Sequence, residues 1–443
     1  MKNIVIHKGH DIKMSGVPSD NTFSSIQCTS VSLMPIEFRG VKPKLLISEG
    51  EKVKIGQAIF YDKTKPDVKW ASPANGTIKE IKFGPRRVIE KIEISNDGNE
   101  ALKNDILSKD QIKSSDRDTI LKYILNSNIF PLIRQRPFNK VADQNTAPRD
   151  VFISGYNTAP LAVDLHKIIE DNRDSFQLGL TVLTRLTMGQ VYLTLKTPIN
   201  FDDSIVQTIS GPHPAGNVGI QIHHTKPLKP NEVVWTVNAQ HVITLGRLFE
   251  TGAYDPKITV SIGWSGSDKP DVVRTLAGAK IDSFLNNQSS NKLVRIISGD
   301  VLTGQAVETH QFIGFYDSSI TIIDDKVDRP FLGMLSPGNS KTKYSLTNTF
   351  LSFTGQLFNF TTSQNGEKRA MVPINAWEKV LPMDILPNPL YRAILAQDIE
   401  ETEQLGIWEC DDEDFALCSF ACPSKIDVGQ VIRDGLDLLE QES

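Results

Sequence analysis

The chain has 443 residues, a formal net charge of −5 and 39% hydrophobic residues. This length predicts roughly two to four domains, and the mild charge excludes a nucleic-acid-binding protein, which would carry a strong basic excess. Four cysteines exclude a disulfide scaffold. We find no secretory leader after Met1 and no apolar run near the ~18–20 residues that cross a bilayer. We therefore expect a soluble intracellular protein that acts at a membrane only through a partner.

Residues 1–100 are predicted to form an N-terminal segment and a barrel-sandwich module. From residue 31 to residue 97, short β-prone stretches alternate with turn pairs such as Glu49-Gly50 and Asn75-Gly76, where glycine allows a positive φ. This pattern is similar to biotinyl and lipoyl domains. Lys63 could be a swinging-arm attachment site, but the residues after it match neither the lipoyl nor the biotin signature. That mismatch favours an ordinary solvated turn lysine.

Residues 101–256 show the alternation of helices and strands that is typical of an α/β layer. We predict helices at Asp118–Leu125 and Ala159–Glu170 and a strand that begins at Val151. Further strands are expected at Leu178–Leu183 and Gln190–Leu195. The interpretation is a Rossmann-like α/β domain that continues through residue 256.

The remaining chain is predicted to form two more domains. Residues 257–330 contain short strands and one expected helix at Asp271–Leu276, which indicates a β-grasp domain of the soluble-ligand-binding type. Residues 331–443 are expected to form a helical C-terminal domain with an acidic helix at Asp398–Gln404. The fold class is therefore α/β multidomain.

The cysteines of the last domain form half of an iron–sulfur motif. Cys418 and Cys422 have the C-x3-C spacing, and Pro423 follows directly, as at the end of a ferredoxin-type run. A four-iron cluster needs four thiolates, and the only other nearby thiol is that of Cys410. We interpret the three cysteines as vestigial and expect no metal. Cys418 and Cys422 are expected to be reduced and packed on a helix face.

Two other patterns are weak evidence for a binding site. Gly211–Gly219 has the glycine spacing G-x4-G-x2-G, which matches neither a dinucleotide fingerprint nor a P-loop, so we interpret it as a structural loop. His223 and His224 are adjacent, and in a strand they would face opposite ways and could not chelate one ion. No nucleophile or metalloprotease motif is present in the sequence.

The segment from residue 129 to residue 140 combines aromatic rings with cations. Aromatic faces can stack on a planar ring, and guanidinium groups can hydrogen-bond to quinone carbonyls. The alternative interpretation is a surface loop whose phenylalanines anchor it while its arginines face water. The candidate quinone contacts are Phe130, Arg134, Arg136, Pro137, Phe138 and Lys140.

Several segments together resemble the family of A subunits of the Na⁺-translocating NADH:quinone oxidoreductases, which is related to the C subunit of the Rnf complex and to the flavin subunit of complex I. The resemblance covers essentially the whole chain. The segments that carry it are Val41–Gln57, Ser72–Thr77, His213–His223, Arg295–Gly304, Arg369–Glu378, Met383–Pro387 and Asp412–Pro423.

The resemblance implies a peripheral subunit on the cytoplasmic face of the membrane. Its partners would be the integral-membrane and the flavin and iron–sulfur subunits of a complex that passes electrons from NADH to ubiquinone and exports Na⁺. The flavin-binding relatives carry a glycine-rich phosphate loop where this chain reads Arg134–Lys140. We therefore expect no tightly bound cofactor, neither FMN nor an iron–sulfur cluster, and no catalysis by the isolated chain. Ubiquinone is the one ligand expected. The alternatives are a docking subunit without a ligand and a free-standing flavin-dependent oxidoreductase.

Overall fold

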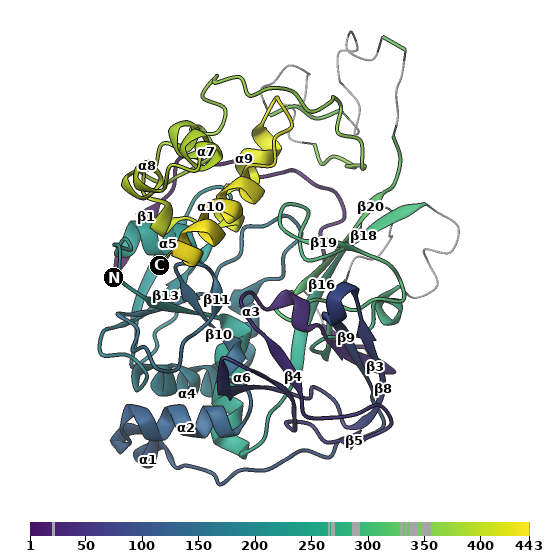
Figure 1. The fold of residues 1–443 in the computed structure, drawn as a ribbon, viewed down its shortest axis with the longest axis vertical. Coiled ribbons are helices and arrows are strands. Elements are labelled where there is room, and N and C mark those ends of the chain that lie inside the picture. Colours follow the sequence, from purple (N-terminus) through teal and green to yellow (C-terminus); the bar gives the residue numbers. More distant parts are fainter. Residues whose placement is uncertain are drawn as a thin grey trace.

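The computed structural model describes residues 1–19, 23–264, 266, 271–285, 293–327, 331–332, 335, 343–346 and 356–442. Over these residues the chain is a mixed α/β protein with four sheets and a group of helices near its C-terminus (Figure 1). The multidomain α/β class predicted from the sequence is confirmed.

The largest sheet has seven strands in the order β1-β14-β13-β12-β15-β10-β11. They are β1 (Lys2–Val5), β10 (Ile133–Arg136), β11 (Lys140–Val141), β12 (Val151–Ser154), β13 (Val191–Leu195), β14 (Ile205–Ser210) and β15 (Val234–Asn238). The strands from β1 to β15 in this order are parallel, whereas β10 and β11 are antiparallel additions at one edge. Because β12 pairs with β13 on one side and β15 on the other, the order in which the chain fills the sheet reverses beside β12.

Helices cover both faces of this sheet. They are α1 (Lys109–Ser114), α2 (Arg117–Asn126), α3 (Leu165–Asp171), α4 (Arg173–Thr184), α5 (Val218–Thr225) and α6 (Ala239–Thr251). Figure 1 shows α4 and α6 on one side of the sheet and α5 on the side that faces the C-terminal helices. Glycine allows α4 and α6 to approach closely, because a Cβ on Gly246 would lie 1.7 Å from the Ser175 carbonyl oxygen.

The barrel sandwich is built from two small antiparallel sheets, in the orders β3-β9-β8-β5 and β4-β6-β7. The strands are β3 (Ser30–Leu33), β4 (Pro43–Leu45), β5 (Lys52–Val53), β6 (Ala58–Asp62), β7 (Lys65–Ala71), β8 (Gly76–Phe83) and β9 (Ile89–Ser95). In the core the rings of Phe60 and Trp70 stack with their centroids 4.6 Å apart. Lys63 is exposed in the turn between β6 and β7, where the sequence places it.

A third region is a six-stranded sheet in the order β19-β18-β20-β16-β17-β2. Its strands are β2 (Phe23–Ser25), β16 (Lys257–Trp264), β17 (Asp271–Leu276), β18 (Val294–Ser298), β19 (Gln305–Val307) and β20 (Ser319–Asp324). The N-terminal segment therefore joins two sheets, because β1 pairs with β14 and β2 pairs with β17. The Asn3 side chain accepts a hydrogen bond from the Thr208 hydroxyl, 205 residues later.

The C-terminal region is helical, as expected. Its helices are α7 (Pro387–Ala396), α8 (Ile399–Gln404), α9 (Asp412–Ala421) and α10 (Val428–Glu442). The predicted helices near Asp118–Leu125 and Asp398–Gln404 are confirmed by α2 and α8. Within the described part of the chain, no helix combines the length and the apolar character needed to cross a bilayer.

Three local predictions are wrong. Leu178–Leu183 lies inside α4, because a short, continuous apolar run is compatible with either a buried strand or a buried helix. Asp271–Leu276 is strand β17, in which Val272 and Val273 supply the β-branched character that favours a strand over a helix. The helix predicted from Ala159 begins only at Leu165, where the Asp164 carboxylate caps it.

Candidate functional site

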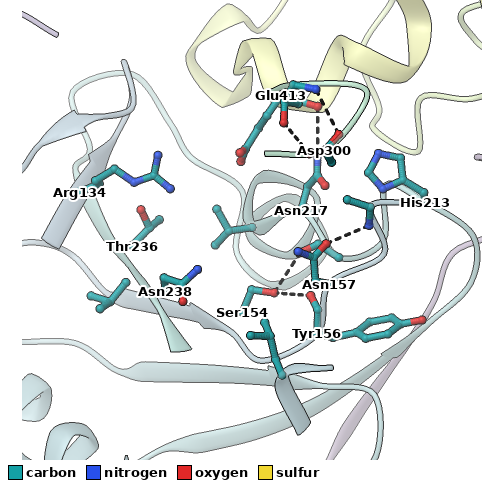
Figure 2. Close-up of a pocket in the computed structure, with 16 residues that line it drawn as sticks. Arg134, Ser154, Tyr156, Asn157, His213, Asn217, Thr236, Asn238, Asp300 and Glu413 are labelled. Carbon is teal, nitrogen blue, oxygen red and sulfur yellow. Dashed lines mark hydrogen bonds between the residues drawn. The ribbon is translucent and has the colours of Figure 1, made fainter. Parts of the chain in front are cut away.

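A crevice of about 160 Å³ lies at the carboxyl edge of the seven-stranded sheet (Figure 2). Ser154 ends β12, Asn238 ends β15, and Asn217 precedes the first turn of α5, so the crevice lies where the strand order reverses. Open parallel sheets bind ligands at this position, because loops diverge there to opposite faces. Asp300, from the loop after β18, and Glu413, from α9, close the crevice from two other regions of the chain.

Three polar side chains in this crevice have capacity for a ligand. The guanidinium of Arg134 makes no hydrogen bond or ion pair within the described part of the chain, and it lies over the Tyr316 ring at 4.6 Å. The buried Thr236 hydroxyl and the buried Nε2 of His213 also have no partner there. An unsatisfied buried donor costs about 1–3 kcal/mol, so these groups would gain from a ligand that accepts hydrogen bonds.

Arg134 and Thr236 are held side by side by the sheet. They are opposite each other in the antiparallel pair of β10 and β15, and directly opposed residues share one face. Figure 2 shows both side chains entering the crevice from one side and His213 standing on the other. Burial lowers the pKa of His213, although the nearby carboxylates of Asp300 and Asp11 oppose this effect. The crevice therefore presents one cation and a neutral imidazole from opposite walls.

A pair of acidic side chains lies behind Arg134. The Asp317 Oδ2 and the Glu37 Oε1 are 2.4 and 3.1 Å from the point where a Cβ on Gly314 would be, so a larger residue there would displace the Asp317 carboxylate. Burial raises the pKa of Glu37 to about 8, and the Asp317 charge adds to this shift. The Asp317 pKa is raised for the same main reason, while Arg134 opposes the shift. With a pKa of about 8, Glu37 is mostly protonated at pH 7 and gives the Arg134 guanidinium no counter-charge.

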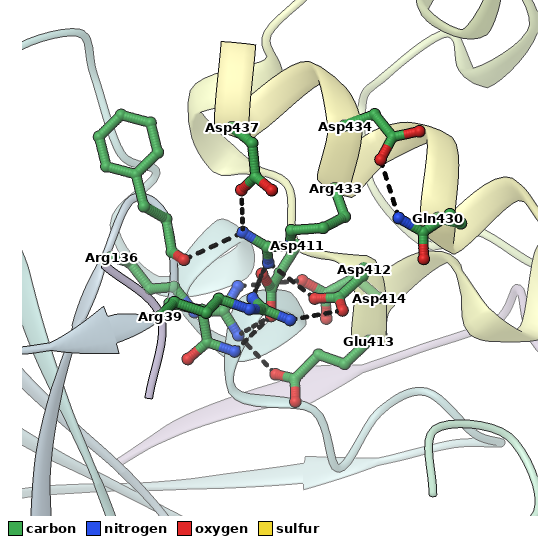
Figure 3. Close-up of polar contacts among 12 residues, drawn as sticks. Arg39, Arg136, Asp411, Asp412, Glu413, Asp414, Gln430, Arg433, Asp434 and Asp437 are labelled. Carbon is green, nitrogen blue, oxygen red and sulfur yellow. Dashed lines mark hydrogen bonds and ion pairs between the residues drawn. The ribbon is translucent and has the colours of Figure 1, made fainter. Parts of the chain in front are cut away.

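An ion-pair network locks the C-terminal helices onto the rest of the chain (Figure 3). The Arg136 guanidinium, only 4% exposed, lies 3.1 Å from Asp411, 2.5 Å from Glu413 and 3.7 Å from Asp414. Arg433 pairs with Asp411 and with Asp412. Arg39, next to the barrel sandwich, lies 2.9 Å from Asp412, so three regions of the chain meet in one network.

The pKa values of the carboxylates in this network are shifted in opposite directions. Burial raises the pKa of Asp411 to about 6, against the opposing effect of Arg136. Burial also raises the pKa of Asp414 well above its usual range. In Asp412 the effect of burial is outweighed by Arg433 and Arg39, and the pKa is lowered.

Of the six candidate residues between 130 and 140, only Arg134 lines the crevice. Phe130 is fully buried, with its ring edge against Trp235, and Pro137 is buried. Phe138 is half-buried against Trp408, and Lys140 pairs with Glu440. The alternative interpretation as a surface loop is wrong for Arg136, which pairs with α9 instead of facing water. This segment is mainly an internal contact between the sheet and the C-terminal helices.

The cysteines are buried, and the two adjacent histidines form hydrogen bonds with separate partners. Cys410, Cys418 and Cys422 are free and buried, and Cys418 packs on α9 as expected. His223 and His224 lie on helix α5, so the strand assumed for them is wrong. Their rings bond separately to Glu409 and to the Pro382 carbonyl. Among the described residues, no group of three His, Cys, Asp or Glu side chains could hold a metal ion.

Sequence reasoning missed most of the crevice. Residues 211–219 were interpreted as a structural loop, yet they supply His213 and Asn217 to the crevice walls. The available signal was their position between strand β14 and helix α5, at the edge where parallel sheets bind ligands. Thr158 was missed because it contacts His213 only in the folded chain, 55 residues away in sequence.

The barrel sandwich, the parallel sheet and the crevice between regions define a multidomain α/β protein with a ligand-sized site at its sheet edge. Three family models match the chain: the NqrA N-terminal barrel-sandwich hybrid domain over residues 4–97, the NqrA second alpha/beta domain over 115–254, and the NQRA C-terminal domain over 259–309. The chain belongs to the NqrA family, which comprises the A subunits of the Na⁺-translocating NADH-quinone reductases.

Curated relatives that are named as A subunits of this reductase match over the full length. The protein of Vibrio anguillarum is 37% identical over 446 residues, covering 99% of this chain and 100% of the relative. Those of Hahella chejuensis and Pasteurella multocida are 35% and 36% identical, also over 99% of this chain and 100% of each relative.

Two solved structures of an NAD⁺-reducing NiFe-hydrogenase are only weakly similar to the chain. The air-oxidized form of an NAD⁺-reducing NiFe-hydrogenase has a TM-score of 0.37 and 10% identity, over 74% of this chain and 63% of that one. The H2-reduced form has a TM-score of 0.36 and 8% identity, over 48% of each chain.

Proposed function

We propose that the chain is a peripheral subunit of a Na⁺-translocating NADH:quinone reductase, bound at the cytoplasmic face to integral-membrane and flavin and iron–sulfur subunits. Support comes from relatives that are named as parts of this reductase and match the chain over its full length. In this proposal the chain catalyses nothing alone and has no tightly bound cofactor. The glycine-poor segment Arg134–Lys140 supports this, because it builds sheet strands and ion pairs in place of an open phosphate loop.

The same proposal includes the finer fold assignments. The parallel β12, β13 and β15 arrangement supports a Rossmann-like domain at 101–256, and the six-stranded sheet supports a β-grasp domain at 257–330. The barrel sandwich belongs to residues 1–100 and the helices to residues 331–443. The pairing of β1 and β2 with later strands means that these domains share strands at their borders.

We further propose that the crevice binds the ring of ubiquinone, and the observation that carries this is the unpaired Arg134 guanidinium in its wall. The volume of about 160 Å³ is on the scale of one six-membered ring, since a cavity of roughly 150 Å³ binds benzene, so the substituents of the quinone ring would extend towards the crevice mouth. Leu165, Val218 and Val237 give apolar contact for the ring, while Arg134 can donate to a carbonyl oxygen. Of the six sequence candidates, only Arg134 remains a direct contact in this proposal.

The test is a titration of the purified chain with a short-tail ubiquinone, followed by tryptophan fluorescence. Trp235 precedes Thr236 on β15 and serves as a nearby reporter. We expect saturable binding in the wild type and about tenfold or weaker binding in Arg134→Gln, because one charge-assisted hydrogen bond is lost. The matched control is Arg392→Gln, an exposed arginine on α7 that should leave binding unchanged.

Two results would overturn the quinone proposal. Absence of saturable binding by the wild type would leave a docking subunit without a ligand. Binding that Arg134→Gln and Arg392→Gln weaken equally would place the quinone outside the crevice. A purified wild-type protein with flavin absorbance would instead support the free-standing oxidoreductase.

A further inference from the structure

We propose, building on the quinone proposal, that His213 donates from Nε2 to the carbonyl opposite the one held by Arg134, and that Thr158 is the positioning residue that fixes the proton on Nε2. The crevice would then recognise a ring by two hydrogen-bond acceptors at opposite ends. Nothing in the family models or in the names of the relatives assigns these roles.

The hydrogen bonds of Thr158 determine the direction of its contact with His213. The Gly216 amide donates to the Thr158 hydroxyl oxygen at 2.8 Å, and the same oxygen lies 3.1 Å from His213 Nδ1. Within the described part of the chain, Nδ1 is the only acceptor that the single hydroxyl hydrogen reaches. In the proposal the Thr158 hydroxyl donates to Nδ1, so that a neutral imidazole carries its hydrogen on Nε2.

The backbone of His213 is held by hydrogen bonds to the N-terminal segment. The His213 amide donates to Asp11 at 2.8 Å, and its carbonyl accepts from the His10 amide at 2.8 Å. A Cβ on Gly9 would lie 2.2 Å from the His213 carbonyl oxygen, so the N-terminal segment packs directly against this residue. The residue is 97% buried, and its ring cannot turn freely to find another partner for Nε2.

The charge around His213 supports a neutral donor. Burial lowers its pKa, while the carboxylates of Asp300, Asp11 and Glu413 and a contact with the Thr158 backbone oppose this effect. A neutral imidazole whose Nδ1 already accepts a hydrogen bond can only donate from Nε2. The Nε2 atom has no partner among the described residues, so a carbonyl oxygen from a ligand would satisfy a donor that is otherwise unpaired.

The opposite wall completes the match to the ring. Arg134 and Thr236 enter together from β10 and β15, across the crevice from His213 (Figure 2). A para-quinone carries its two carbonyl oxygens at opposite ends of one ring, so Arg134 can donate to one oxygen and His213 to the other. A ring with a single carbonyl would leave one wall unpaired, which gives the site a basis for selecting a dicarbonyl ring.

The test uses the full chain labelled with ¹⁵N in its histidine rings, with the His213 signals assigned through His213→Gln. In the ligand-free wild type we expect the chemical shifts of the Nε2-protonated tautomer. Thr158→Val, which keeps the shape but removes the hydroxyl, should lose this preference, and Thr158→Ser should retain it. Titration with a short-tail ubiquinone should then give about tenfold weaker binding for Thr158→Val and wild-type binding for Thr158→Ser.

The outcomes separate this inference from the proposal on which it rests. Failure of the wild type to bind the quinone overturns the quinone proposal, and the tautomer measurement still tests the role of Thr158. Quinone binding that depends on Arg134 but is equal in wild type and Thr158→Val, with the same tautomer in both, overturns this inference alone. If Thr158→Val does not fold, a Thr158→Ser chain that protonates Nδ1 gives the same refutation.

Discussion

Replacing Arg136 with methionine should loosen the C-terminal helices while leaving the sheets folded. Arg136 is the only cation within 4 Å of Glu413 and Asp414 in the described part of the chain, and it shares Asp411 with Arg433. Removal leaves at least one buried carboxylate without a counter-charge. Removing one partner of a buried ion pair costs about 3–5 kcal/mol of stability. We expect a cost of this size here, because the side chains of Asp411 and Asp414 are fully buried.

The cost should depend on pH in a defined direction. At pH 8, above the Asp411 pKa of about 6, the Asp411 carboxylate is ionised, so the loss of Arg136 removes one of its counter-charges. The pKa of Asp411 is about 6 and that of Asp414 is raised, so protonation near pH 5 neutralises the uncompensated charge. We therefore expect the penalty to be largest near pH 8 and clearly smaller near pH 5.

The assay is amide hydrogen exchange of α9 and α10, which reports local opening in a multidomain chain. A loss of 3–5 kcal/mol corresponds to roughly 10²- to 10⁴-fold faster exchange, up to the limit set by global unfolding. The exposed Arg392→Met on α7 is the matched control and should exchange at the wild-type rate. Unchanged exchange in α9, or a penalty that is equal at pH 5 and pH 8, would refute the reasoning.

The remaining predictions concern stability. His241 is buried and its pKa is lowered to about 4, mainly by burial, so the folded chain binds fewer protons than the unfolded chain between pH 6.5 and 4. The contribution of neutral His241 to the free energy of unfolding is complete above pH 6.5 and is lost as the pH falls from 6.5 to 4, by up to about 3 kcal/mol. Melting curves of His241→Phe should show a weaker loss of stability over the same pH range. Gly246→Ala should lower the melting temperature through an overpacking cost of about 1–3 kcal/mol, because its Cβ would meet the Ser175 carbonyl at 1.7 Å, and a wild-type melt would contradict this. Asp116→Ala should speed amide exchange in the first turn of α2, since the cap on the Thr119 amide at 2.9 Å is lost, whereas the control Asp116→Asn should exchange at the wild-type rate.

The barrel sandwich could be predicted from sequence because its turns are locally encoded. At Glu49-Gly50 the glycine has the predicted positive φ of 81°, whereas the turn predicted at Asn75-Gly76 is wrong, because Gly76 begins strand β8 and glycine is needed there for packing, with a Cβ 1.9 Å from the Ser95 carbonyl. Leu178–Leu183 lacks such a local signal. Its apolar run forms part of α4, which packs closely on α6, with the Val242 carbonyl 2.2 Å from where a Cβ on Gly179 would be.

The site was less predictable because its partners are distant in sequence. The composition of the segment 129–140 indicated that Arg134 could contact a ligand, but gave the same prediction for Arg136. The two arginines lie two residues apart on β10 and share one face of the strand, but they differ in what they meet: Arg134 lines the crevice, whereas Arg136 pairs with Glu413, 277 residues later. No local pattern carries that difference, because charge and size are the same at both positions.

The pairing of β1 with β14 also determines when the largest sheet can be completed during synthesis. Residue 3 leaves the ribosome early, but its neighbour on β14 follows 205 residues later. At ~5–20 residues per second this interval lasts roughly 10–40 s. During that time the nascent chain carries an unpaired strand whose only place in the finished sheet does not yet exist. A chaperone that binds extended segments could therefore bind β1 during this interval.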